Sequence, residues 1–369
     1  MPFCLSRPAK MKFGRVCQPA VWAPGMESNR SIRRVCIIPK VHGIGGMVSF
    51  RGRLVNGLLE RGYEVTFNLR DTPYNTILVI GGTRDLAGLW RAKRRGVRIF
   101  QRLDGMNWIH RKTHTGWRHY FRSEYGNFIL STIRQRLADQ IIYQSEFSHR
   151  WWEEVYGKTR VEYRVVHNGV DLEHYTPTGE GDLPAEHYRI LVVEGTLGSG
   201  YEAGLQNAVR LGELLRDNFK REIEVVVVGR VSQALQQEWI ARTNLMLNFT
   251  GQVPAEIIPE IDRSAHVLFA ADINPACPNS VIEALACGLP VAGFDTGALS
   301  EIVTEGSGLL VPYGGDPWKL DPPDLDGLSV AVNRILDFQA DYRLAARRRA
   351  EVAFGIDRMV EGYLEAMQL

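Results

Sequence analysis

Short apolar runs alternate with amphipathic segments along the chain. In the first half the apolar runs lie at 35–38, 64–67, 77–80, 97–100, 139–143 and 161–166, with a helix expected near 46–60. Runs of this length between helical segments indicate parallel strands joined by crossover helices. The pattern therefore predicts a Rossmann-like α/β domain over residues 35–175.

The same pattern starts again after a segment rich in proline and glycine. Residues 176–187 contain Pro177, Gly179, Gly181 and Pro184, which is typical of a linker. Strands are then expected at 190–193, 224–228, 245–249, 267–270, 290–294 and 308–311, with helices near 202–217, 325–339 and 341–368. This predicts a second α/β domain over 188–355. Two doubly wound domains place a ligand cleft at the carboxyl ends of their strands.

Length and composition agree with a two-domain protein. A chain of 369 residues exceeds one ordinary core, and 45% apolar with 23% charged residues is typical of globular proteins. No apolar run approaches the roughly 20 residues that span a bilayer. Residues 1–34 are basic and broken by proline and glycine, so we expect a flexible leader and no secretory signal. Five scattered cysteines without metal-ligand spacing favour the cytoplasm, no disulfide framework and no metal.

The net charge of +2 conceals a strong asymmetry. Residues 1–170 hold 29 Lys and Arg against 12 Asp and Glu, whereas residues 171–369 hold 15 against 30. A basic run gathers in the positive half, at Arg91, Lys93, Arg94, Arg95, Arg98 and Arg102. One candidate partner is an anionic membrane surface, so the protein is expected in the cytoplasm with peripheral contact at the inner face of the membrane. The alternative is the solvated face of a surface helix. No nucleic-acid motif accompanies the charge.

Residues 278–291 carry the most specific chemistry. They predict a helix between two loops, with Glu283 inside its first turns. A helix N-terminus offers unpaired N–H groups and the positive end of a dipole, which suits a phosphate. Asn279, Ser280 and Val281 would supply these donors, and Glu283 can accept hydrogen bonds from a ribose diol. A nucleotide diphosphate is the ligand that fits both.

This stretch, through Gly288 and Pro290, resembles the donor-site signature of the retaining GT-B glycosyltransferases of family 4, the glycosyl transferases group 1. Residues 165–171, Val-Val-His-Asn-Gly-Val-Asp, resemble the hinge of that family, although Asn-Gly alone also marks a turn. The resemblance implies two Rossmann-like domains. It also implies that residues 356–369 form a helix that crosses back to the first domain.

Two further segments of the first domain are candidates for the cleft. The turn at 42–47 contains Gly45 and Gly46, which let a backbone approach a ligand closely and expose N–H groups to an anion. It resembles the glycine loop of the family, which contacts donor phosphate and acceptor. Asp104 follows a strand and is expected to orient or deprotonate an acceptor hydroxyl, unless it caps the next turn.

The sequence also departs from the family after the first strand of the second domain. Members usually carry an Arg and a Lys there that clamp the diphosphate, but residues 194–202 contain neither. Gly195, with Gly198 and Gly200, would instead bring backbone N–H groups to the phosphates. Arg230 is either a substitute cation or a surface residue. Backbone donors supply less charge than a bidentate Arg.

The family's first glutamate is missing as well, because its position holds Pro275. Asp272 lies three residues upstream and is a possible replacement, and Cys277 can still offer a backbone N–H. Gly297 and Glu301 match a further family helix, where Gly297 permits close approach to the nucleotide. For Glu301 the alternative is an ordinary acidic residue on a helix.

The resemblance implies transfer of a sugar from a nucleotide-diphospho sugar to a hydroxyl with retention of configuration. No metal or cofactor is expected, and the acceptor would be an envelope, capsule or lipid-linked glycan. Within the family chemistry, the leaving phosphate helps to deprotonate the acceptor. Two rivals stay open: a catalytically weak sugar-nucleotide-binding protein, which the missing residues favour, and a GT-B sugar-nucleotide epimerase.

Overall fold

The protein is described from a computed structural model, which covers residues 33–369 except 42, 44, 114–115, 198–201 and 305. The basic leader up to residue 32 lies outside the described residues. So do Gly198 and Gly200, which were expected to wrap a phosphate.

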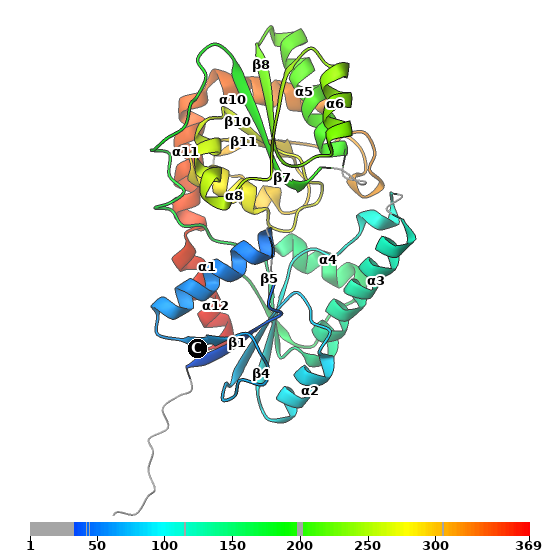
Figure 1. Ribbon diagram of the computed structural model, residues 1–369, viewed down its shortest axis with the longest axis vertical. Helices are drawn as coiled ribbons and strands as arrows, with labels where there is room; N and C mark the ends of the chain where they lie inside the picture. Colours follow the sequence, from blue (N-terminus) through cyan, green and yellow to red (C-terminus); the bar gives the residue numbers. More distant parts are fainter. Residues whose placement is uncertain (1–32, 42, 44, 114–115, 198–201, 305) are drawn as a thin grey trace, which may run out of the picture. The chain divides into compact units, whose positions relative to one another are not determined.

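The first domain is built on six parallel strands in the order β2-β1-β3-β4-β5-β6 (Figure 1). Each crossover between these strands carries a helix or a loop, as expected for a doubly wound sheet. The elements are β1 (Arg34–Ile38), α1 (Gly46–Glu60), β2 (Glu64–Thr66), β3 (Thr76–Ile80), α2 (Leu86–Arg94), β4 (Arg98–Leu103), α3 (Trp117–Thr132), β5 (Gln140–Tyr143), α4 (Glu146–Tyr156) and β6 (Glu162–Val165).

The second domain repeats this design with six parallel strands in the order β12-β11-β10-β7-β8-β9. Its elements are β7 (Tyr188–Thr196), α5 (Ala203–Phe219), β8 (Ile223–Arg230), α6 (Gln233–Arg242), β9 (Met246–Gly251), α7 (Ile258–Arg263), β10 (Val267–Ala270), α8 (Asn279–Ala286), β11 (Val291–Phe294), α9 (Leu299–Ile302), β12 (Gly308–Val311), α10 (Leu325–Asp337) and α11 (Gln339–Ala353). The two sheets confirm the predicted fold class.

Each sheet is covered on both faces, which explains why its strands read as short, continuous apolar runs. In the first domain, α1 and the last helix, α12 (Ile356–Met367), share one core with Ile37, and α2 and Ile133 lie in the core of the opposite face. In the second domain, α8 and α11 cover one face, and α5 and α10 cover the other.

Two chain crossings between the domains lie side by side. The N–H of Val170 donates to the carbonyl of Phe354 at 2.8 Å, and the N–H of Ile356 donates to the carbonyl of Val170 at 2.9 Å. These bonds fall where α11 ends and α12 begins. The helical pattern over 341–368 is therefore divided into two helices, because the chain breaks at Gly355 to pair with the hinge, and the second helix begins where 356–369 was expected to cross back. Beyond the break, α12 packs on the first domain, against Phe50 and Leu54 of α1.

Candidate active site

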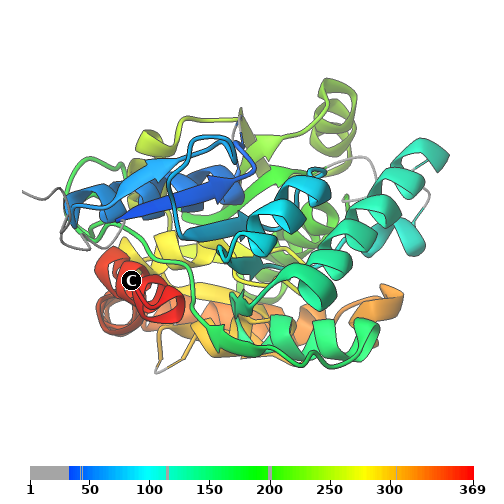
Figure 2. The same ribbon diagram turned by 90° about the horizontal axis from the view of Figure 1, so that it is seen from below.

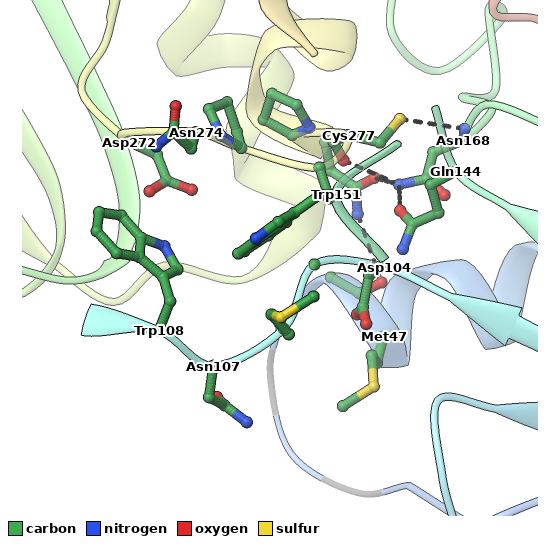
Figure 3. Close-up of a pocket in the computed structure, with 18 of the residues that line it drawn as sticks. Met47, Asp104, Asn107, Trp108, Gln144, Trp151, Asn168, Asp272, Asn274 and Cys277 are labelled. Atoms are coloured by element: carbon green, nitrogen blue, oxygen red, sulfur yellow. Dashed lines mark hydrogen bonds between the residues drawn. The ribbon is translucent and has the colours of Figure 1, made fainter. Parts of the chain in front are cut away.

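A cavity of about 620 Å³ is lined by the carboxyl edges of both sheets (Figure 3). The first domain contributes the turn at Gly45 and Gly46, together with Asp104 after β4. The second domain contributes the loop from Asp272 to Asn279 that leads into α8. This is the position at which doubly wound folds bind ligands. The sequence predicted Gly45, Gly46, Asp104, Cys277 and Asn279 as site residues, and all five line this one cavity.

Two helices begin at the cavity. Helix α1 starts at Gly46 and α8 starts at Asn279. The two starts meet, because the Asn279 amide nitrogen lies 3.5 Å from the carbonyl oxygen of Gly46. Gly45 has φ 139°, a conformation that side chains other than glycine rarely adopt. The first N–H groups of each helix lack intrahelical partners, so two positive dipole ends face the same space.

Two side chains of α4 fix the backbone of Asp104. Its carbonyl accepts hydrogen bonds from Trp152 Nε1 at 2.7 Å and from Ser148 Oγ at 3.0 Å, which fixes the loop after β4 onto α4. The carboxylate lies on the side of Met47 (Figure 3). Burial raises the pKa of Asp104, and the charge of Arg102 counteracts this rise. A carboxylate in this setting is suited to accept a hydrogen bond or a proton from a hydroxyl.

Arg102 is a cation that the sequence analysis placed within a surface run. The structure corrects this: Arg102 is 2% exposed and lines the main cavity. Its guanidinium stacks over Phe50 at 3.8 Å from the ring centroid, and Nη2 donates to Asn168 Oδ1 at 3.1 Å. Nε and Nη1 have no hydrogen-bond partner among the described residues. Because these nitrogens have almost no exposed surface, Arg102 can act on an anion in the cavity through its positive charge, not through a direct hydrogen bond from these two atoms.

Asn168 joins both domains behind the cavity. Its amide nitrogen lies within hydrogen-bond distance of Asn279 Oδ1 (2.8 Å), Gln144 Oε1 (3.0 Å) and the carbonyl of Cys277 (3.1 Å). Two amide hydrogens serve these three acceptors, so one bond is shared. The sequence pair Asn168-Gly169 indicated only a turn. Nothing in the sequence predicted the hydrogen bonds that Asn168 makes to the second domain.

Glu283 does not face an open ribose site in this structure. Its carboxylate forms an ion pair with Arg53 of α1, with 2.5 Å between Oε1 and Nη2, and both side chains are largely buried. Arg53 also donates to the carbonyl of Gly169 at 3.0 Å. Burial raises the pKa of Glu283, and Arg53 opposes the rise. The ribose role of Glu283 stays a prediction that requires this pair to open or to share its hydrogen bonds.

The other residues predicted around α8 contribute mainly to packing. Val281 is buried in the core of the second domain, so any contact with a phosphate would involve its backbone N–H. Ser280 is half-buried beside it. The Cys277 thiol lies 3.4 Å from the N–H of Asn168, and burial raises its pKa to about 12, so it is not a nucleophile.

A carboxylate, Glu194, lies in the segment where the family carries phosphate-binding cations. Glu194, next to Gly195 at the end of β7, lines a second cavity together with Asp272. Gly195 itself is exposed at an irregularity of the strand. Asp272 as a whole residue is exposed, but protein atoms surround its carboxylate. This burial raises the pKa of the Asp272 carboxyl to about 6. Burial and the charge of Asp272 also raise the pKa of Glu194.

Three predicted donor-site residues lie away from the main cavity. The Glu301 carboxylate accepts the N–H groups of Glu146 (2.8 Å) and Phe147 (2.7 Å), so it caps α4. Gly297 has φ 61°, and a side chain there would collide with Pro275, so its role in the structure is close approach of the site loop. Arg230 is exposed and donates to Gln252 at 2.9 Å. These contacts favour the alternatives given above for Glu301 and Arg230, and the direct roles of all three residues stay predictions.

Within the described ranges, no three His, Cys, Asp or Glu side chains gather as metal ligands would.

Comparison with known proteins finds a family that the second domain resembles. Residues 189–336, which run from β7 nearly to the end of α10, match the family described as glycosyl transferases group 1. Over these residues the second domain is similar to the glycosyl transferases group 1. Solved structures with the same fold cover both domains. Sucrose-phosphate synthase from Thermosynechococcus elongatus superposes with a TM-score of 0.72 at 18% identity, covering 91% of this chain and 98% of that one.

Two further proteins are similar to this chain, one in structure and one in sequence. HepE of Anabaena, solved with UDP-glucose, gives a TM-score of 0.63 at 15% identity over 91% of this chain and 99% of that one. Among curated proteins, a D-inositol 3-phosphate glycosyltransferase of Geodermatophilus obscurus is 28% identical over 248 residues, 62% of this chain and 52% of that protein. The chain spans about half the length of the curated relatives it matches.

Proposed function

We propose that this protein is a glycosyltransferase that moves a sugar from a nucleotide-diphospho sugar to a hydroxyl group of an acceptor. The observation that carries the proposal is the meeting of two helix N-termini, of α1 and α8, at one cavity that also holds Asp104. Two dipole ends suit a diphosphate, and a carboxylate across the cavity suits a hydroxyl acceptor.

The residues around the cavity divide between donor and acceptor. The N–H groups at Gly46 and Asn279 would bind the diphosphate, with Arg102 adding positive charge from the first domain. Asp272 would replace the absent glutamate and accept hydrogen bonds from donor-sugar hydroxyls. Asp104 would orient the acceptor hydroxyl. Catalysis then rests on positioning and on stabilising charge that develops on the leaving phosphate.

We further propose that the anomeric configuration is retained. The acceptor oxygen would form its bond to the anomeric carbon on the face from which the diphosphate leaves. The breaking bond carries its electron pair to the phosphate oxygen, and a phosphate oxygen takes the proton of the acceptor hydroxyl. The acceptor is an envelope, capsule or lipid-linked glycan in this proposal, because the first domain carries the excess positive charge.

The test is turnover of a panel of nucleotide sugars that includes UDP-glucose, the ligand in the HepE structure. Release of free nucleotide, with Asp104→Asn lowering the rate while nucleotide binding persists, is the expected result. Glu301→Gln is the matched control, since that carboxylate faces α4 and should leave turnover unchanged. The anomeric configuration of the product, determined by NMR, tests retention.

A catalytically weak sugar-nucleotide-binding protein is the second candidate, and the Glu194–Asp272 pair favours it. Two neighbouring acids, one of them in the segment where the family has two cations, would oppose a diphosphate when ionised. Binding without release of nucleotide from any donor would establish this candidate. An epimerase is distinguished by mass spectrometry, because it would convert the donor sugar without an acceptor.

A further inference from the structure

Helix α3 turns aromatic side chains toward solvent. Trp117, Phe121, Tyr125 and Phe128 are between 53% and 69% exposed. At about 100° per residue these four positions fall within an arc of about 80°, so they form one stripe. We call these four residues the aromatic stripe. In Figures 1 and 2, α3 lies at the outer edge of the first domain.

The polarity of α3 is inverted relative to an ordinary surface helix. Its buried residues include the polar Ser123, Asn127 and Ser131. The Asn127 amide donates to the carbonyl of Asn107 at 2.7 Å, so a polar contact holds the helix to the domain. Surface helices normally bury their apolar face. An exposed stripe of large aromatic residues on such a helix marks an interaction surface.

Basic residues border the stripe. Arg118 and Arg122 are exposed and follow it along one side, and the Arg118 guanidinium carbon lies 5.3 Å from the ring centroid of Trp117. Aromatic rings beside arginines are typical of helices that lie in the headgroup region of an anionic bilayer. No helix of the described residues is long and apolar enough to cross a membrane. The charge excess of the first half of the chain has the matching sign.

We propose that α3 docks this protein on an anionic membrane surface, with the aromatic stripe inserted at the level of the headgroups. Arg118 and Arg122 lie beside the lipid phosphates. Trp and Tyr rings place an apolar body at the acyl boundary and a polar atom in water, which suits this depth.

A third cavity, distinct from the one at Glu194, lies between this surface and the active site. It measures about 390 Å³, shares Met47 and Asp104 with the main cavity, and is lined by Arg122, Tyr125 and Ile129 of α3. Tyr125 belongs both to the stripe and to this lining. Docking through α3 therefore gives a membrane-held acceptor a route to Asp104. This second step rests on the proposed function, whereas docking itself does not.

The test is flotation of the full chain with vesicles of phosphatidylcholine, with or without phosphatidylglycerol. We expect binding to the anionic vesicles, and Trp117→Ser/Phe121→Ser should weaken it about tenfold or more. The matched control is Phe338→Ser/Leu344→Ser, two apolar residues of the other domain that are 56% and 74% exposed. This control should bind as the wild type does. Equal loss in both double variants, or no binding by the wild type, would overturn the proposal.

A charge variant keeps the test decisive if the aromatic variant misfolds. Arg118→Gln/Arg122→Gln should weaken binding about fivefold per arginine, and added salt should remove most of that difference. Arg210→Gln/Arg242→Gln, exposed in the second domain, is its control. If the aromatic variant instead dissociates an oligomer and keeps its vesicle affinity, a second copy covers the stripe and docking is wrong. Nucleotide release without vesicles should stay unchanged in the aromatic variant and in both control variants, which separates docking from catalysis.

Discussion

The Arg53–Glu283 ion pair links α1 to α8 and offers the sharpest test of the site. Its atoms are 2.5 Å apart, and the side chains are 13% and 11% exposed. Removing one partner of a buried pair costs about 3–5 kcal/mol, because the other charge stays behind uncompensated. The informative perturbations are Glu283→Ala, Arg53→Met and the double variant.

The two single variants should differ, because the partners differ in how they can lose charge. After Glu283→Ala the guanidinium of Arg53 stays charged at any accessible pH, although it keeps the Gly169 carbonyl. We expect Glu283→Ala to lower the free energy of unfolding by about 3 kcal/mol, near the lower end of the range for a broken buried pair. After Arg53→Met, the carboxyl of Glu283 can take up a proton, since burial already raises its pKa. An acid with a raised folded-state pKa loses stability as pH rises through that pKa. Arg53→Met should therefore cost less at pH 5 than at pH 8.

Urea unfolding of the four proteins at both pH values measures these effects, with nucleotide affinity determined separately under conditions where each variant is folded. The double variant Arg53→Met/Glu283→Leu should recover most of the loss, with a coupling energy of at least about 1 kcal/mol. Additive losses, or a cost of Arg53→Met that does not change with pH, would refute the reasoning. If Glu283 also binds ribose, Glu283→Ala weakens nucleotide binding in addition.

Three further variants test single contacts. Asp262 is 1% exposed beside the weakly donating Cys287 thiol, and burial raises the pKa of its carboxyl well above the usual value. Asp262→Asn should therefore raise the free energy of unfolding at pH 8 by at least about 1 kcal/mol in urea. This gain should vanish near pH 4, where the carboxyl of Asp262 is protonated. Arg102→Met should raise the pKa of Asp104 further and move the acidic limb of the nucleotide-release pH profile to higher pH, while Arg102→Lys should leave the limb in place. Glu301→Ala should lower unfolding stability by about 1 kcal/mol through the lost cap of α4, with unchanged nucleotide affinity.

The alternation of apolar runs was sufficient to predict both sheets, because strands covered on both faces are apolar along their length. It failed where tertiary contacts decide. Residues 341–368 carry one helical pattern, and the break at Gly355 depends on a backbone pairing with Val170 that is remote in sequence. No helix was predicted at 117–132, where α3 buries polar residues and exposes aromatic ones. Hydrophobic periodicity identifies a helix by its buried apolar face, so it does not predict a helix that buries polar residues.

The candidate site shows the same division between local and remote signals. The glycine turn and the start of α8 have local signatures, since glycine conformation and helix starts depend on neighbouring residues. Arg53 and Arg102 carry no such signature. Arg53 meets Glu283 across 230 positions of sequence, and Arg102 sits in a basic run whose other members are on the surface or in α2. Whether a single arginine belongs to a site depends on its burial and its neighbours in space, and the sequence alone does not show either.

The distribution of charge around the cavity has a consequence for how a donor is held. In the second domain, Glu194 of β7 and Asp272 after β10 line one cavity, and burial raises the pKa values of both carboxyl groups. The positive groups are the Arg102 guanidinium of the first domain and the two helix N-termini, one from each domain. In the proposed function, a diphosphate would therefore gain much of its electrostatic stabilisation from the domain outside the family match. Protonated acids would add hydrogen-bond donors, whereas ionised acids would repel the phosphate. Donor affinity should consequently depend on both domains being present and decline as pH rises past about 6.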